Sequence, residues 1–191
     1  MHAAGLATMA YYYFDFRDVK KQDLYGLLSS LILQLSTDSD SCYDILSRLY
    51  LENARGIRKP IISALKKCLT DMLSLPGQAP TYIIIDAIDE CLNSPGRLSA
   101  REDVLELIEK LVDLKLPSVH LCVACRPEME IRMVLEPLTS FKISLHDEKG
   151  QREDIVAYIK SVVRSDRRMR KWREEDRELV IDTLSDRSDG M

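Results

Sequence analysis

The chain has 191 residues, with 27 basic and 31 acidic side chains and a formal net charge of −4. This balance offers no general attraction to nucleic acid or anionic membranes, so any such binding has to be local, and we expect no nucleic-acid partner. No apolar run reaches the ~18 residues of a membrane span, and the N-terminus lacks the basic start of a secretory signal. We therefore predict a cytoplasmic protein.

Short strands and amphipathic helices are predicted to alternate along the chain. Hydrophobic periodicity and the Gly, Pro and Ser breaks predict strands at residues 10–16, 82–85, 120–125 and 141–145. The same patterns predict helices at residues 24–35, 43–53, 60–73, 104–114 and 129–135. This alternation predicts an α/β fold, a parallel sheet with helices on both faces.

Beyond residue 146 the pattern changes. Residues 154–163 and 174–184 are predicted as helices with no strand between them. A basic cluster from Arg164 to Arg173 surrounds Trp172, which would suit nucleic acid or anionic lipid. Because Asp166 and residues 174–176 are acidic, we favour a salt-bridged junction between two helices.

The five cysteines are odd in number and lie mostly in apolar patterns, which indicates reduced thiols. Cys122 and Cys125 form a C-x-x-C pair, a spacing that also occurs in redox and zinc sites. Residues three apart in a strand point to opposite faces, and no second pair completes a zinc set. We therefore favour a structural role for both.

Three acids follow the most hydrophobic strand directly. Asp86, Asp89 and Glu90 come after the run Tyr82-Ile-Ile-Ile85. Ligands bind at the carboxyl ends of strands in open parallel sheets, so these acids are candidates for Mg²⁺ and water positioning. The alternative is an acidic turn that caps the next loop.

Arg126 directly follows the strand at residues 120–125. If the two strands are adjacent, its guanidinium lies beside the acids, where it could bind a phosphate or pair with Asp86. A purely structural pair between this arginine and a carboxylate is the other interpretation.

These motifs resemble those of the NACHT domain of fungal STAND-type signalling NTPases, the nephrocystin-like N-terminal domain group. Residues 82–91, Tyr-Ile-Ile-Ile-Asp-Ala-Ile-Asp-Glu-Cys, look like the Walker B segment of that family, and Cys-Arg-Pro-Glu at 125–128 looks like its sensor segment. The resemblance extends from residue 10 to residue 191. It implies an irregular N-terminus at residues 1–9, a partial nucleotide-binding core at 10–146 and the start of a helical lid at 147–191.

The resemblance also implies Mg²⁺ and ATP or GTP as ligands. By position, Asp86 matches the acid that organises the metal, Asp89 and Glu90 match the catalytic acids, and Arg126 matches the phosphate sensor. It implies a switch that acts in self/non-self recognition or programmed cell death.

The phosphate-binding loop of that family is absent, because the 191 residues contain no G-x-x-x-x-G-K-[ST]. We therefore expect a three-layer P-loop-NTPase-like sheet that lacks its P-loop strand, so that two strand edges that should be paired are left open. We expect no efficient hydrolysis of nucleotide by this chain. We also expect the chain to be a fragment, a truncated gene model or a degenerate paralogue. The alternative function is a protein-interaction remnant that associates with full-length NACHT relatives or with itself.

Overall fold

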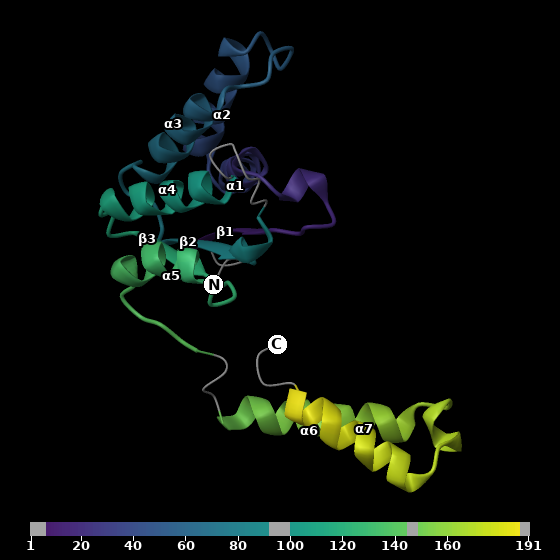
Figure 1. Ribbon diagram of the computed structural model, residues 1–191. Helices are drawn as coiled ribbons and strands as arrows, with labels where there is room; N and C mark the ends of the chain where they lie inside the picture. Colours follow the sequence, from purple (N-terminus) through teal and green to yellow (C-terminus); the bar gives the residue numbers. More distant parts are fainter. Residues whose placement is uncertain (1–6, 92–99, 145–148, 188–191) are drawn as a thin grey trace. The chain divides into compact units, whose positions relative to one another are not determined.

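The computed structural model describes residues 7–91, 100–144 and 149–187 (Figure 1). The chain divides into two compact units, Met1–Thr139 and Ser140–Met191. The first unit contains the sheet and most of the buried core, and the second contains a pair of helices. The predicted domain boundary at residue 146 stays a prediction.

The sheet of the first unit has three parallel strands in the order β1-β2-β3. They are β1 (Thr8–Tyr13), β2 (Thr81–Asp86) and β3 (Val119–Val123). Their parallel pairing confirms the predicted α/β class. β2 pairs directly with β3 from Thr81↔Val119 to Ile85↔Val123. That the missing strand leaves two strand edges open stays a prediction.

The outer edge of β1 is covered by a side chain. The Gln34 amide accepts the backbone N–H of Tyr11 at 3.1 Å and donates to the Tyr11 carbonyl at 2.7 Å. One residue thus satisfies both backbone groups of Tyr11, with which an added strand would pair. Next to β3, the Ser118 carbonyl accepts the Thr81 N–H, and the Ala124 N–H donates to the Ile85 carbonyl. The backbone groups of the even-numbered residues therefore face β2, and those of Leu121 face the other edge.

The described residues of the first unit form five α-helices. They are α1 (Leu24–Asp38), α2 (Asp40–Glu52), α3 (Ile62–Leu73) and α4 (Ala100–Asp113), followed by the short α5 (Met129–Leu135). The Asp23 carboxylate caps α1 by accepting the Gly26 N–H at 2.8 Å. The predicted apolar stripe of this helix is fully buried: Leu24, Leu27, Leu28, Leu31, Ile32 and Leu35.

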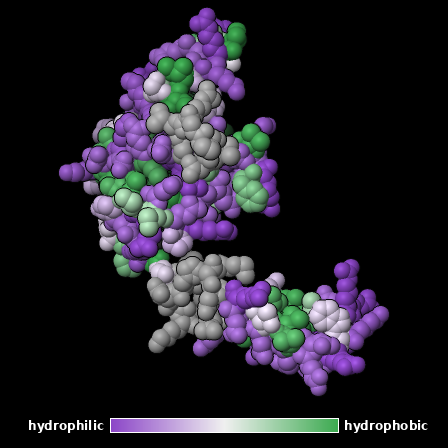
Figure 2. Space-filling view, viewed as in Figure 1, coloured by the Kyte–Doolittle hydropathy of each residue, from purple (hydrophilic) through white to green (hydrophobic). Residues whose placement is uncertain are grey.

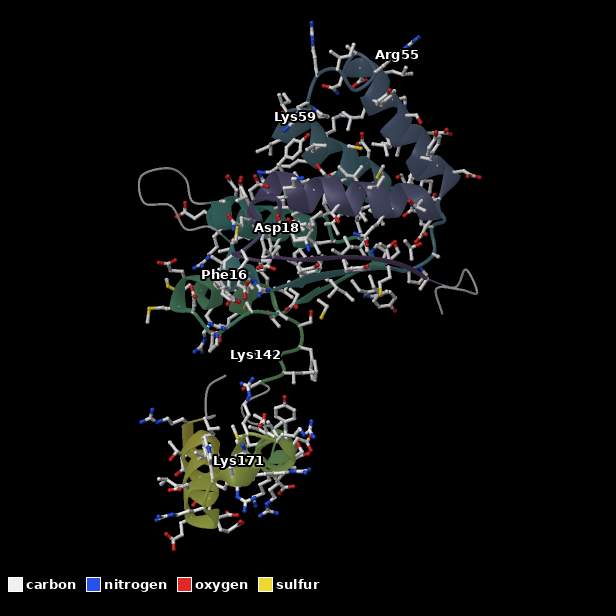
Figure 3. All side chains as sticks on the ribbon, turned by 90° about the vertical axis from the view of Figure 1, so that its right-hand side faces the viewer. Phe16, Asp18, Arg55, Lys59, Lys142 and Lys171 are labelled. Carbon is white, nitrogen blue, oxygen red and sulfur yellow. The ribbon has the colours of Figure 1, made fainter. Side chains whose placement is uncertain are left out.

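The two faces of the sheet differ in how far they are covered. Ala10, Ile83 and Ile85 are fully buried on the face that α1 and α4 cover. Figures 1 and 3 place α5 on the opposite side of the sheet, where it forms the third of the predicted layers. This third layer is incomplete, since Tyr11 and Tyr82 remain about half exposed.

The second unit consists of α6 (Lys149–Ser165), a short 3₁₀ turn (Met169–Lys171) and α7 (Glu174–Arg187). Val163 and Ile181 are its buried apolar residues among those described, and Figure 2 shows hydrophobic side chains on its visible face. The predicted strand at residues 141–145 is wrong for residues 141–144, which form no regular element, and Leu145 lies outside the described residues. Phe141 is 79% exposed and pairs with none of the described strands.

No helix in the described ranges is both long and apolar enough to cross a membrane.

Candidate functional site

The candidate site lies where the three parallel strands end. Beyond β2 the chain turns at Ala87, whose φ of 56° and ψ of 44° lie in the left-handed region. Ile88 is fully buried and anchors the short 3₁₀ turn Ile88–Glu90. The three predicted acids have different hydrogen-bond partners and do not form one metal-binding cluster.

Asp86 and Glu90 have different surroundings. The Asp86 side chain is exposed at the strand tip, where its Oδ1 accepts the Ala87 N–H at 2.8 Å. Glu90 Oε2 accepts the N–H of Phe16 at 3.2 Å, which ties the segment after β1 to the acid turn after β2. Figure 3 labels Phe16 at this end of the sheet.

Asp89 joins the acid turn to the segment after β3. Its Oδ1 accepts the backbone N–H of Arg126 at 3.0 Å, and its Oδ2 lies 3.6 Å from the Arg126 Nε. The prediction that the arginine lies beside the acids is confirmed, but its carboxylate partner is Asp89 rather than Asp86. The Asp89 side chain is 7% exposed and that of Arg126 is 79% exposed. The pair is thus solvated on the cation's side, where such pairs contribute about 0.2–1 kcal/mol.

Arg101 is a further site residue, which the sequence analysis missed. It is 6% exposed and projects from the first turn of α4. Its Nη1 lies 2.5 Å from Glu128 Oε2, and its Nη2 donates to the carbonyl of Asp89 at 2.6 Å. The signal in the sequence was its spacing, because residues 101, 104, 105 and 108 form the buried stripe of this helix. One buried guanidinium therefore holds the acid turn against the Cys-Arg-Pro-Glu segment.

Asp15 and Arg17 form a second charged pair, just after β1. Arg17 Nε and Nη2 donate to the two carboxylate oxygens of Asp15 at 3.0 and 3.2 Å. These hydrogen bonds lower the pKa of Asp15 below its ordinary value. The Arg17 side chain is 76% exposed, so its guanidinium remains accessible to an anion in solvent.

The C-x-x-C pair lies at the carboxyl end of β3. Cys122 and Cys125 are both free and exposed, and β3 ends between them at Val123. Burial of the Cys125 thiol group raises its pKa, and the negative charge of Asp89 raises it further. A raised pKa keeps this thiol neutral, whereas reactive thiols have lowered values.

The predicted junction between the last two helices contains ion pairs at its flanks. Arg164 pairs with Glu178 at 3.1 Å, and Arg177 pairs with Glu174. Asp166 instead accepts the backbone N–H of Arg168 at 2.6 Å. The structure therefore supports a salt-bridged helix junction.

Metal ligands are sparse in the structure. Among the described residues, no three His, Cys, Asp or Glu side chains are grouped to hold a metal ion. A pocket of about 300 Å³ lies between α3 and α4, lined by Lys66, Thr70, Leu107 and Lys110 among others, away from the acids. A divalent ion at Asp86 would therefore depend on oxygen atoms from a ligand and from water.

Comparison with protein-family models gives a match over most of the chain. Residues 2–126 match the family model described as Nephrocystin 3, N-terminal, which is well over half of the chain and includes all four predicted site residues. No match is found among curated proteins, and none among solved structures.

Proposed function

The chain belongs to the nephrocystin 3 N-terminal family, and from this premise we propose that it is a partial NACHT-type nucleotide-switch module of a fungal STAND signalling NTPase. Its place would be in the cytoplasm, in self/non-self recognition or programmed cell death. The proposal is supported by the parallel sheet and by the charged groups at the carboxyl ends of its strands.

The contact between Asp89 and Arg126 is the observation on which this proposal rests. Residues 37 positions apart meet at the edge where open parallel sheets bind ligands, and the guanidinium stays exposed. An exposed guanidinium held by one carboxylate can still bind a phosphate with its other N–H groups. We assign Arg126 to the phosphates of ATP or GTP.

Asp86 fits a Mg²⁺ ligand. Its carboxylate is exposed, and Mg²⁺ commonly takes one or two carboxylates while phosphates and water supply its other oxygen ligands. When bound, the ion would neutralise the charge of the nucleotide phosphates. This arrangement agrees with the sparse metal ligands of the described residues.

We assign Asp89 and Glu90 to the positioning of water. Each carboxylate accepts a backbone N–H, from Arg126 and Phe16 respectively, and each still has lone pairs that can accept from water. Because the 191 residues contain no phosphate-binding loop, we propose that the chain alone does not hydrolyse nucleotide efficiently.

The test is Mg²⁺-dependent binding of fluorescent ATP and GTP to the purified chain. We expect saturable binding that both Asp86→Ala and Arg126→Ala weaken, with phosphate release at the background rate. Asp113→Ala and Arg187→Ala serve as matched controls, because they remove the same charges from the last turns of α4 and α7. If the folded chain binds neither nucleotide, the proposal is wrong.

A second candidate function is protein association, with full-length NACHT relatives or with a second copy. It is favoured by the contrast between the sheet edges: Gln34 covers β1, whereas no described strand pairs with the free edge of β3. Leu121→Pro should weaken co-purification with a full-length relative, since it removes an N–H that faces away from β2. A strictly monomeric chain that captures no relative would exclude this function.

A further inference from the structure

The segment between α2 and α3, residues 53–61, is here called the α2–α3 tip. It is the part of the first unit that lies farthest from the sheet (Figures 1 and 3). Its convex shape distinguishes it from the acid-lined edge of the sheet. The role inferred for the tip below does not require nucleotide binding.

The backbone of this tip is strained and well defined. Ala54, Arg55 and Gly56 follow one another with φ of 52°, 56° and 83°. The left-handed region is unfavourable for the first two, which are not glycine. The turn is held by hydrogen bonds from the N–H groups of Gly56 and Arg58 to the carbonyl of Asn53, both at 3.2 Å. The strain is therefore maintained by a specific set of contacts.

This backbone presents apolar side chains to solvent. Ile57 is 87% exposed and Ile61 is 69% exposed, while Leu51, at the end of α2, is 60% exposed. Figure 2 shows hydrophobic residues among hydrophilic ones at this end of the first unit. Exposed isoleucine at the apex of a strained turn contributes nothing to the core, which points to an external partner.

Cations surround these apolar residues. Arg55, Arg58 and Lys59 flank Ile57, and Glu52 is the one acid between Leu51 and Pro60. None of the three cations forms an ion pair with a described residue, although Lys59 Nζ lies 5.7 Å from the ring of Tyr25. Figure 3 shows Arg55 and Lys59 at the tip. The tip is thus locally basic on a chain whose net charge is −4.

The shape and the chemistry together favour a lipid surface over a peptide. Apolar peptides bind in grooves, whereas this surface is convex. A bilayer accepts a protruding apolar side chain at its headgroup boundary, and anionic headgroups attract the surrounding cations. We propose that the α2–α3 tip is a docking site for anionic membrane surfaces, in which Ile57 enters the interface and Arg55 and Arg58 contact lipid phosphates.

The test is co-sedimentation of the full chain with phosphatidylserine/phosphatidylcholine vesicles, compared with vesicles of phosphatidylcholine alone. We expect binding that requires phosphatidylserine and that salt weakens. The variant Arg55→Gln/Arg58→Gln/Lys59→Gln should lose about fivefold in affinity for each charge that contacts the surface. Ile57→Ser should weaken binding without changing its dependence on phosphatidylserine.

Two matched controls test whether vesicle binding depends on the tip itself rather than on cations or exposed apolar side chains elsewhere in the chain. Arg167→Gln/Arg170→Gln/Lys171→Gln removes the same charge from the junction between α6 and α7. Val19→Ser shortens another exposed apolar residue, one that is 79% exposed. Both should bind vesicles like the unmodified chain. Circular dichroism must show that all variants are folded.

A spectroscopic measurement tests insertion directly. Trp172 is the one tryptophan of the chain, so Ile57→Trp combined with Trp172→Phe places the fluorophore at the tip. We expect a blue shift of its emission with phosphatidylserine vesicles, because the indole enters the interface. The proposal is overturned if the folded chain does not sediment, if the control variants lose as much binding as the tip variants, or if the tip binds single-stranded DNA and no vesicle.

Discussion

Arg101 donates a hydrogen bond of 2.6 Å to the backbone carbonyl of Asp89, and the same guanidinium contacts Glu128. Three segments of the chain thereby meet: the start of α4, the turn after β2 and the segment after β3. The arrangement of the candidate site depends on a side chain that lies outside its sequence motifs.

The first prediction concerns this buried guanidinium. Arg101→Met should reduce the free energy of unfolding by about 2–4 kcal/mol, because the part-buried Asp89 carbonyl and the Glu128 carboxylate lose their donor. Urea denaturation measures this loss. Arg101→Lys should recover part of it, and Glu109→Gln, an exposed change on the same helix, should remain within about 0.5 kcal/mol of the unmodified chain. An unchanged midpoint for Arg101→Met would contradict the contacts described.

The second prediction concerns the covered edge of β1. Gln34→Leu removes both hydrogen bonds to Tyr11 and should destabilise the chain by about 1 kcal/mol. It should also cause self-association that increases with protein concentration, because a free strand edge is a template for pairing. Light scattering after size-exclusion chromatography measures this. Leu33→Ala, on an exposed neighbour, is the control and should not associate.

The third prediction reverses a common rule for helices. Replacing glycine by alanine inside a helix usually stabilises it by about 1 kcal/mol. At Gly26 an added Cβ would lie 2.5 Å from the Lys20 carbonyl oxygen and 2.6 Å from the Tyr12 hydroxyl. Gly26→Ala should therefore destabilise the chain by about 1–3 kcal/mol in thermal or urea unfolding. Ser29→Ala, in the same helix, should not, and a gain in stability for Gly26→Ala would refute the close contact.

The fourth prediction is a loss of stability at alkaline pH. Burial raises the pKa of the Cys68 thiol from 9.0 to about 11. The folded state thus binds this proton more tightly than the unfolded state, so the stabilisation is complete below pH 9 and is lost as the pH rises through 11. Urea unfolding across this range should show a declining midpoint.

The matched variant for the alkaline loss is Cys68→Ala. It should lower stability at every pH because it shortens a buried side chain, but its midpoint should decline less between pH 9 and 11. Burial also raises the pKa of Tyr12, so the Cys68→Ala chain should keep part of the decline. Adding Tyr12→Phe to that chain should remove this remaining part. Parallel profiles for the unmodified and Cys68→Ala chains would show that the thiol does not contribute.

The order of elements was predictable because it depends on local patterns. The apolar stripe of α1 and the hydrophobic run of β2 are each visible within a few residues, and both form as predicted. The strand predicted at residues 10–16 instead lies at Thr8–Tyr13, because its bounds are set by pairing with β2. Residues 141–144 have a strand-like pattern but pair with no described strand.

The sequence by itself determined the α/β alternation and the placement of Asp86, Asp89, Glu90 and Arg126 after strands, since both follow from periodicity along the chain. Only the tertiary structure decided that β2 pairs directly with β3, that Arg126 pairs with Asp89, and that Arg101 holds both segments. These contacts join residues 12 to 38 positions apart. Partners over such separations are selected by strand register and by the packing of α4, which no local pattern encodes.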